Sequence, residues 1–417
     1  MYGYGIPKRN RCLRTNLVDY IYGMEKILFW LVFLTSLTKC VNRFLVLPDV
    51  IYYGIYLGCF IWLLFRGGII VNKKYLFFIS AVFFSIWLND IPALFKVSAR
   101  TFAFFSLVFM VGPFFVNSRL IYIRRILFIR TLLVLRWIVL LSFLLKFIAP
   151  GLVTNDSGFC GLTVHSMVLS PLAGICVLYS FYRFHLSETR WELYKEVVYV
   201  CICFLVLLLS GSRGALAATV VGVAFFYIRL YRRQMGKMLQ AVLFILLLAV
   251  STSALWWPYT ERLRQKTETS RKNGGTVSSR ERIWQDRIDE FTAYPLFGVG
   301  FSSFNLDYIQ SEHTINRHTG TIEPGTSWLF LLSSMGLYGF LSFLLPFTYG
   351  IYILFRELDT GLNGGLLSSM MVLFSVHMLI EGYITASGAY ICFLLWLSLS
   401  ESEQILQQTT NKQLLSV

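Results

Sequence analysis

Apolar runs long enough to cross a lipid bilayer recur along nearly the whole chain, and no other feature constrains the fold as strongly. A transmembrane helix needs about 20 apolar residues, with about 17 to 25 tolerated. The pattern predicts about twelve such helices, at 27–46, 49–65, 75–91, 98–116, 131–149, 163–181, 197–211, 214–231, 238–257, 326–346, 365–381 and 386–400. The predicted fold class is an all-α polytopic membrane protein.

Composition supports one membrane domain over several soluble ones. Of the 417 residues, 56% are hydrophobic and only 14% are charged, whereas a soluble domain carries about 25% charged residues. The net charge of +15 is a property also found in nucleic-acid-binding proteins. Here most Lys and Arg stand in short loops between apolar runs, where they set orientation. We therefore expect a lipid bilayer and no nucleic acid as a partner.

The charges of the short loops predict the orientation. With the N-terminus inside, the inner loops hold Arg66, Lys73, Lys74, Arg119, Arg124, Arg125, Arg130, Arg183, Arg190, Lys195, Arg229, Arg232, Arg233 and Lys237, and the short outer loops hold Lys39, Arg43 and Lys146. Cytoplasmic loops are the ones enriched in Lys and Arg. Both termini are then cytoplasmic and residues 258–325 lie outside. The predicted parts are residues 1–257 with about nine helices, an extracytoplasmic catalytic loop at 258–325, and residues 326–417 with about three helices and a cytoplasmic tail.

The 258–325 loop is long enough to hold structure of its own. Loops beyond about 15 residues are usually functional or disordered. Ser278 and Glu281 fit a capping box, Ser-x-x-Glu, and the residues that follow have helical spacing up to Phe291. We therefore predict a helix within this loop.

The two faces of that helix separate its arginines. At helical spacing one face is formed by Trp284, Ile288 and Phe291, with Ile283 at its edge, and the opposite face by Arg282, Asp286 and Asp289. Arg280 and Arg287 fall on the apolar side, where an unpaired charge is expensive. Arg282 falls on the solvated side, and an inert surface position is the favoured interpretation there.

Two explanations remain open for the arginines on the packed face. Arg280 stands in the first helical turn, where a bound anion is stabilised by the helix dipole. The alternative is pairing with loop acids such as Asp307 or Glu312. The two explanations are balanced for Arg280, and pairing is favoured for Arg287.

A second arginine stands at the end of a predicted membrane span. Ser210-Gly-Ser-Arg213-Gly-Ala joins two spans at the predicted outer face, with Gly211 and Gly214 permitting a tight turn. Charge at membrane depth indicates function by default, although Arg213 snorkelling to the interface is the simpler alternative.

Together Arg213 and Arg280 place two guanidiniums near the outer leaflet. Guanidinium matches phosphate oxygens bidentately, so these side chains suit an anionic, lipid-linked diphosphate. No metal-ligand cluster accompanies them: His313 and His318 lack nearby acids at helical ligand spacing. We predict a site with no metal and no cofactor.

Three segments resemble the O-antigen polymerase and ligase superfamily, which includes polysaccharide polymerases of the Wzy type. They are Ser212-Arg213-Gly214-Ala215; Ser279-Arg280-x-x-Ile283-Trp284 with Tyr294-Pro295-Leu296-Phe297-Gly298-Val299-Gly300; and Glu323-Pro324-Gly325-Thr326-Ser327-Trp328-Leu329 with Met335-Gly336-Leu337-Tyr338-Gly339-Phe340. Order, topology and loop position match across about residues 197–346. The resemblance implies a GT-C-like architecture with one large, partly helical periplasmic loop in the bacterial inner membrane.

The resemblance also implies roles for individual residues. Arg213 and Arg280 would hold the diphosphate of an undecaprenyl-linked glycan, and Glu323 could accept the proton of the attacking hydroxyl, with His318 and His313 as alternatives. A loop-to-arginine ion pair is the other interpretation of Glu323. Further candidates for contacts with the diphosphate or the glycan are Arg282, Arg287, Trp284, His313 and Trp328.

One departure from the family bears on the activity. Ligases that attach O-antigen to lipid A-core have a His-Asn pair where this chain has Gly325-Thr326. This difference favours a polymerase that joins undecaprenyl-diphosphate-linked repeat units into O-antigen, capsule or exopolysaccharide, with lipid-linked donor and acceptor and a chain-length regulator as a further candidate partner. The alternatives are an O-antigen ligase and, in another class, a polysaccharide flippase, in which charges would line a path inside the spans.

Overall fold

The computed structural model describes residues 23–414 except 90, 92–95, 157, 273–277, 306, 308–314, 317–320 and 358–359. Three residues named above, Glu312, His313 and His318, lie outside the described residues. Except for two pairs of two-residue strands, all regular structure among the described residues is helical.

Most of the helices follow one another with short connections, whereas residues 294–326 separate α13 from α14. The α-helices are α1 (Met24–Cys40), α2 (Asp49–Gly67), α3 (Leu76–Trp87), α4 (Val97–Val111), α5 (Ser118–Ile148), α6 (Pro150–Val153), α7 (Ser166–Leu186), α8 (Arg190–Ser210), α9 (Arg213–Tyr231), α10 (Met235–Ser251), α11 (Ser253–Trp256), α12 (Glu261–Lys272), α13 (Ser278–Ala293), α14 (Ser327–Arg356), α15 (Gly361–His377) and α16 (Tyr390–Leu414). The 3₁₀ helices are η2 (Lys73–Tyr75) and η3 (Trp257–Thr260), and the strands are β1 (Thr154–Asn155), β2 (Gly158–Phe159), β3 (Ile315–Asn316) and β4 (Thr321–Ile322), which pair β1 with β2 and β3 with β4.

Six of the described helices are long and apolar enough to cross a membrane, namely α2, α5, α7, α8, α9 and α14. The chain is therefore a polytopic membrane protein. Each of the twelve predicted spans contains a helix, but the others are shorter or less apolar than these six. The number of spans stays a prediction.

Several helices extend well beyond the predicted spans, which corrects the placement of basic residues in loops. α5 begins at Ser118 and not near residue 131, so the four arginines predicted in an inner loop lie on this helix. Arg124 is 1% exposed and donates to the carbonyl oxygens of Phe109, Met110 and Phe115. Free carbonyls at the end of a helix need donors, and the guanidinium of Arg124 supplies them for α4.

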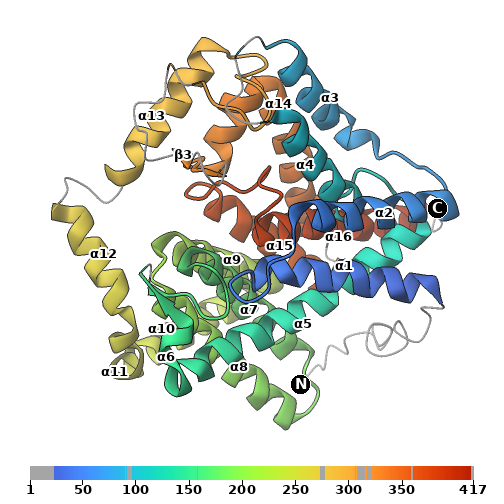
Figure 1. The fold of residues 1–417 in the computed structure, drawn as a ribbon. Helices are drawn as coiled ribbons and strands as arrows, with labels where there is room; N and C mark the ends of the chain where they lie inside the picture. The colour runs from blue at the N-terminus through green and yellow to red at the C-terminus, as the bar shows by residue number, and fades with distance from the viewer. Residues whose placement is uncertain are drawn as a thin grey trace.

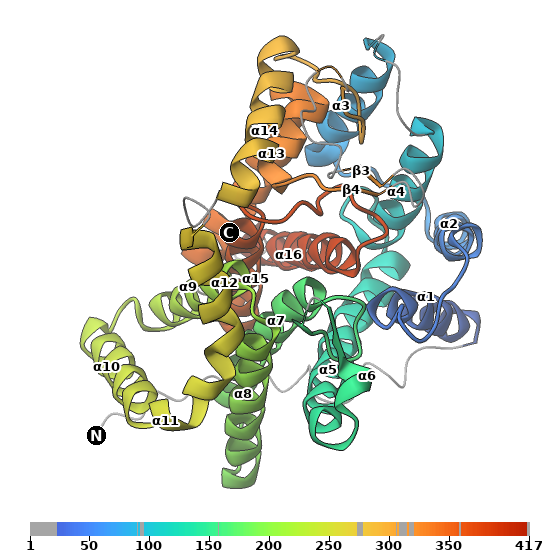
Figure 2. The ribbon, with the colours of Figure 1, turned by 60° about the vertical axis from the view of Figure 1, so that its left-hand side comes forward.

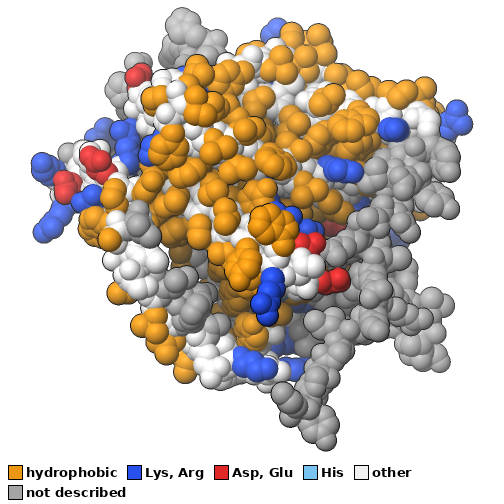
Figure 3. Space-filling model, turned by 90° about the horizontal axis from the view of Figure 1, so that it is seen from below, with side chains coloured by type: hydrophobic (Ala, Val, Ile, Leu, Met, Phe, Trp, Pro, Cys, Tyr) orange, Lys and Arg blue, Asp and Glu red, His pale blue; other side chains and the backbone are white. Residues whose placement is uncertain are grey.

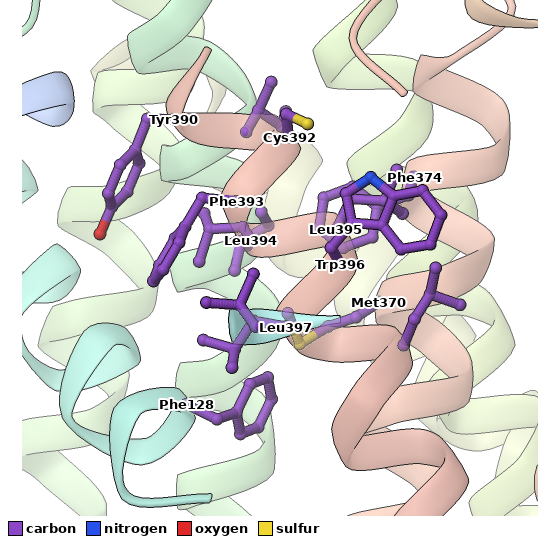
Figure 4. Close-up of a cluster of buried hydrophobic side chains, with 14 of the residues drawn as sticks. Phe128, Met370, Phe374, Tyr390, Cys392, Phe393, Leu394, Leu395, Trp396 and Leu397 are labelled. Atoms are coloured by element: carbon purple, nitrogen blue, oxygen red, sulfur yellow. The ribbon is translucent and has the colours of Figure 1, made fainter. Parts of the chain in front are cut away.

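The hydrophobic core is centred on α16. In Figures 1 and 2 this helix runs between one group of helices that includes α4 and α14 and another that includes α5 and α7. Leu394, Leu395 and Trp396 are fully buried, and Figure 4 shows their side chains pointing in different directions toward neighbouring helices. A helix that is apolar on all sides is a buried helix.

The outside of the bundle is also apolar. Figure 3 shows hydrophobic side chains over much of one face, with charged groups gathered at its left edge and a few among the hydrophobic ones. Phe65 and Ile148 are 87% and 78% exposed. Exposed apolar area on this scale marks an interaction surface, and in a polytopic protein the partner is the lipid bilayer.

A break in α14 determines how the loop after α13 docks. Gly336 has φ 63° and ψ −166° inside the helix, and the chain 295–300 pairs with the interrupted backbone there. The amides of Val299 and Gly300 donate to Ser333 and Ser334, and the amides of Leu337 and Tyr338 donate to Pro295 and Leu296. A Cβ on Gly336 would lie 2.3 Å from backbone atoms of Leu296, so only glycine permits this close approach.

Candidate functional site

Arg213 is the first residue of α9, and the turn before it fixes its position. Gly211 ends α8 in the left-handed region, with φ 69°, as glycine does at a helix C-terminus. Ser212 then caps α9 by accepting from the amide of Ala215 at 3.3 Å. Gly214 belongs to the helix and not to the turn: a Cβ there would lie 2.7 Å from Cδ1 of Ile380.

α12 lies across this turn and adds a second cation. Lys266 donates from Nζ to the carbonyl oxygen of Gly211 at 3.0 Å, and Arg213 donates to Oγ of Ser270 at 3.1 Å. Burial, followed by the charges of Arg262 and Arg213, lowers the pKa of Lys266. The packing of α12 therefore places cations close together at the N-terminal end of α9, although like charges repel each other.

Arg280 lies in the first turn of α13 and meets a carboxylate from far along the chain. Its Nη2 donates to Oε1 of Glu381 at 2.6 Å, and its Nη1 donates to the carbonyl oxygen of Gly325 at 3.0 Å. The Arg280 side chain is 16% exposed and that of Glu381 is 25% exposed. The pair is accessible from solvent on one side, so a ligand can reach it.

The two arginines predicted to act together lie on adjoining segments. The start of α9 packs through Gly214 on Ile380, the neighbour of Glu381 in sequence, and Glu381 pairs with Arg280. Burial raises the pKa of the Glu381 carboxyl, Arg280 opposes this increase, Glu323 adds to it and Lys266 opposes it. We call Arg213, Lys266, Arg280, Glu323 and Glu381 the α9–α13 site.

Arg287 is packed between its own helix and the segment that follows α13. It is 2% exposed, its Nη1 lies 2.6 Å from Oε2 of Glu290, and its guanidinium stands 4.0 Å from the ring centroid of Phe304. The expected pairing with an acid is confirmed, but the acid is Glu290 on the same helix. The backbone amide of Asn305 donates to Oε1 of the Glu290 carboxylate at 2.8 Å.

The predicted faces of α13 are partly wrong. Arg280 and Arg287 lie on the packed side and Arg282 is exposed, as expected. Asp286, however, is 2% exposed, and Ile288 is 43% exposed. The packed face includes the buried ion pair of Arg287 and Glu290 besides Ile283, so it is rotated toward the charged residues relative to the predicted apolar stripe.

The remaining predicted residues occupy different surroundings. Trp284 packs beside Gly325, and its indole Nε1 is buried without a hydrogen-bond partner among the described residues. Trp328 donates its Nε1 to the carbonyl oxygen of Ser375 at 3.1 Å and packs on Phe340, Phe343 and Phe347, within the bundle. Roles in binding substrate stay predictions for Trp284, Arg282, Arg287 and Trp328, and for His313 and His318 outside the described residues.

Sequence reasoning missed Glu381 and Lys266. Glu381 ends the predicted span 365–381, and an acid at a membrane boundary is itself a signal of function. In the structure α15 ends at His377, so Glu381 lies in the loop after it. Lys266 stands among several other cations of residues 262–272, and only the packing of α12 separates it from its exposed neighbours. Among the described residues no group of three or more His, Cys, Asp or Glu is placed to hold a metal ion.

Comparison with known proteins identifies the part of the chain that carries the site. Residues 198–344 match a protein family described as O-antigen ligase. This stretch is an O-antigen ligase family domain. It contains α9, α12, α13 and the first part of α14, and so Arg213, Lys266, Arg280 and Glu323, whereas Glu381 lies beyond it. No curated protein matches the chain.

The motifs that carried the resemblance can now be assigned to contacts. The segment 295–300 fills the break in α14 at Gly336, and Gly325 presents its carbonyl oxygen to Arg280. Thr326 caps α14 by accepting from the amide of Leu329 at 2.9 Å. The family match confirms the predicted resemblance and implies glycan transfer of the ligase or polymerase type.

Proposed function

We propose that this protein polymerises oligosaccharide repeat units carried on undecaprenyl diphosphate at the periplasmic face of the bacterial inner membrane. The proposal is supported by two arginines in the first turns of α9 and α13 that lie on adjoining segments, since Gly214 packs on Ile380 and the next residue, Glu381, pairs with Arg280. Both arginines belong to the stretch that matches the O-antigen ligase family. Lys266 adds a third cation beside them.

These cations suit a diphosphate leaving group. In the proposed reaction a hydroxyl of one lipid-linked repeat unit attacks the anomeric carbon of the glycan on the donor. The bond from that carbon to the diphosphate oxygen breaks, and undecaprenyl diphosphate leaves with the bonding electrons. Guanidiniums placed where this charge develops lower the barrier because they need no reorganisation during the step.

The ligase reaction is a second candidate, since the matched family is described as O-antigen ligase. Both reactions use the same donor and differ in the acceptor. The polymerase is preferred because Gly325-Thr326 stands where the ligases of the resembling family have His-Asn. A transport function is less well supported, because the buried cations described between helices have partners within the fold. Arg136 pairs with Glu196 at 2.8 Å, and Arg124 and Arg229 donate to backbone carbonyl oxygens.

The orientation belongs to the same proposal. The α9–α13 site is placed on the periplasmic side, with both termini in the cytoplasm, because the basic ends of α9 and α14 lie at the opposite end of the bundle. Cytoplasmic ends are the ones rich in Lys and Arg.

Replacing Arg280 tests the function directly. Arg280→Ala should shorten the product from long polymer to single repeat units, with a loss of rate of about 10²–10³, while the protein remains inserted. The matched control is Arg190→Ala, which removes an exposed arginine at the start of α8. Normal chain length in Arg280→Ala would contradict the proposal.

The same assay separates polymerase from ligase. A ladder of glycans on undecaprenyl diphosphate, made by the purified protein from lipid-linked repeat units alone, requires polymerase activity. A product that appears only when a different lipid acceptor is added would identify a ligase.

A further inference from the structure

The loop between α15 and α16 presents Glu381 in a fixed position. The carbonyl oxygen of Glu381 accepts from the amide of Ser327 at 3.1 Å and from its Oγ at 2.8 Å, and the amide of Tyr383 donates back to that Oγ at 2.9 Å. A Cβ on Gly382 would lie 2.0 Å from Cγ of Pro324. The backbone of Glu381 is therefore held against the start of α14 from both sides.

The side chain of Glu381 lies against the guanidinium of Arg280. Its Oε1 is 2.6 Å from Nη2 of Arg280, yet a quarter of the side chain is exposed. Glu323 is exposed and makes no hydrogen bond or ion pair with another described residue. Of the two carboxylates, Glu381 is the one that is both held in place and reachable by a ligand.

The attacking hydroxyl needs a proton acceptor near Arg280. Gly325 and Thr326, which precede α14, carry no group that takes up a proton near neutral pH. The carbonyl oxygen of Gly325 accepts a hydrogen bond from Nη1 of Arg280. Since a hydroxyl is a weak nucleophile until its proton is removed, another group must accept that proton.

We propose that Glu381 is the general base of glycan transfer. This inference rests on the proposed function. The acceptor hydroxyl gives its proton to the Glu381 carboxylate as its oxygen bonds to the anomeric carbon, and the bond to the diphosphate oxygen breaks. The leaving group departs as undecaprenyl diphosphate beside Arg213 and Arg280, and the proton on Glu381 passes to water.

The ion pair couples this base to the donor. In the free protein Arg280 stabilises the ionised Glu381. A diphosphate bound to Arg280 competes for the same guanidinium and adds negative charge beside Glu381, so the carboxylate holds a proton more strongly when the donor is present. Glu381 is therefore expected to be a stronger base when the lipid-linked donor is bound than in the free protein.

The pH dependence has a defined sign. Burial already raises the pKa of Glu381, with Glu323 adding to the effect and Arg280 and Lys266 opposing it; His377 and Tyr383 are the other titratable groups packed nearby. The ionised carboxylate is the active form of a base. The rate should rise with pH through the pKa of Glu381 and level off above it.

Glu381→Gln tests the role because glutamine keeps an oxygen acceptor for Arg280 and removes the base. In lipid nanodiscs with lipid-linked repeat units, we expect kcat to fall about 100-fold or more and the rising limb of the pH profile to disappear. Binding of undecaprenyl diphosphate, measured separately, should be kept or strengthened because a competing negative charge is gone. The matched control, Glu268→Gln, removes an exposed carboxylate of α12 and should leave kcat within twofold of the wild-type value, roughly the effect of an ordinary surface change.

The outcomes separate the two proposals. If Arg280→Ala abolishes the polymer but Glu381→Gln keeps the wild-type rate and pH profile, the base is wrong and the function stands. If Glu381→Gln instead weakens undecaprenyl diphosphate binding and leaves kcat unchanged, Glu381 only positions Arg280, which also overturns the inference. Normal polymer in Arg280→Ala contradicts the proposed function itself.

Discussion

The two ends of α9 carry arginines in opposite situations. The helix has 19 residues, so its ends are about 28 Å apart. At one end Arg229 is 4% exposed and donates to the carbonyl oxygens of Leu354, Glu357 and Gly361 and to Oγ1 of Thr360. At the other end Arg213 shares its surroundings with Lys266 and, through the loop after α15, with Arg280 and Glu381.

The difference separates two physical reasons for an arginine near the end of a helix. Arg229 satisfies carbonyl oxygens where α14 ends, and it also stands in the last turn of its own helix, where a cation is favoured by the helix dipole. Arg213 stands at a helix N-terminus, where the dipole disfavours a cation and favours an anion. The fold explains a cation that completes helix ends, and we propose that a bound anion explains the cations gathered at the start of α9.

The largest effect is expected at the ligand end. Arg213→Ala should lower the rate of polymerisation by about 10²–10³ with little change in the thermal midpoint of unfolding, because the charge it removes is needed for the leaving group. Rates from the lipid-linked substrate and unfolding in detergent check this together. Arg213→Lys should recover only part of the rate, since lysine cannot contact the diphosphate bidentately. A large loss of stability in Arg213→Ala would remove the contrast between the two ends.

The reverse pattern is expected at the other end. Arg229→Ala leaves several buried carbonyl oxygens without donors, at about 1–3 kcal/mol for each one that water does not reach, so the thermal midpoint should drop and less protein should be recovered from membranes. Activity per folded molecule should stay close to that of the wild type. Lost activity at unchanged stability would mean that this end also takes part in the reaction.

A smaller effect is expected for Lys266, and it tests how far the proposed diphosphate site extends along α12. Lys266→Ala should weaken binding of undecaprenyl diphosphate about tenfold, the equivalent of one charge-assisted hydrogen bond. Lys272→Ala, which removes an exposed lysine from the same helix, should change the binding constant less than twofold. Binding to the protein in nanodiscs at constant ionic strength measures both, and equal effects would indicate that α12 contributes only a diffuse positive field.

Much of the fold was predictable from apolar run lengths, because in a bilayer every backbone group must be satisfied within its own helix. α13 begins at Ser278, close to where the capping-box pattern predicted the start of a helix. Helix ends were harder to predict: α5 continues through four arginines that the charge pattern assigned to a loop. An arginine in that stretch can stay within a helix when its guanidinium donates to carbonyl oxygens at the end of a neighbouring helix, as that of Arg124 does.

The sequence by itself determined that this is a membrane protein, that Arg213 begins a span and that Arg280 begins a helix in the long loop. Each of these follows from local spacing. Only the tertiary structure decided that Glu381, 101 residues after Arg280, is its partner, and that α13 buries Asp286 in place of Ile288. Periodicity fixes which residues share a face, but the rotation of that face and the partner of a buried charge depend on contacts between distant segments.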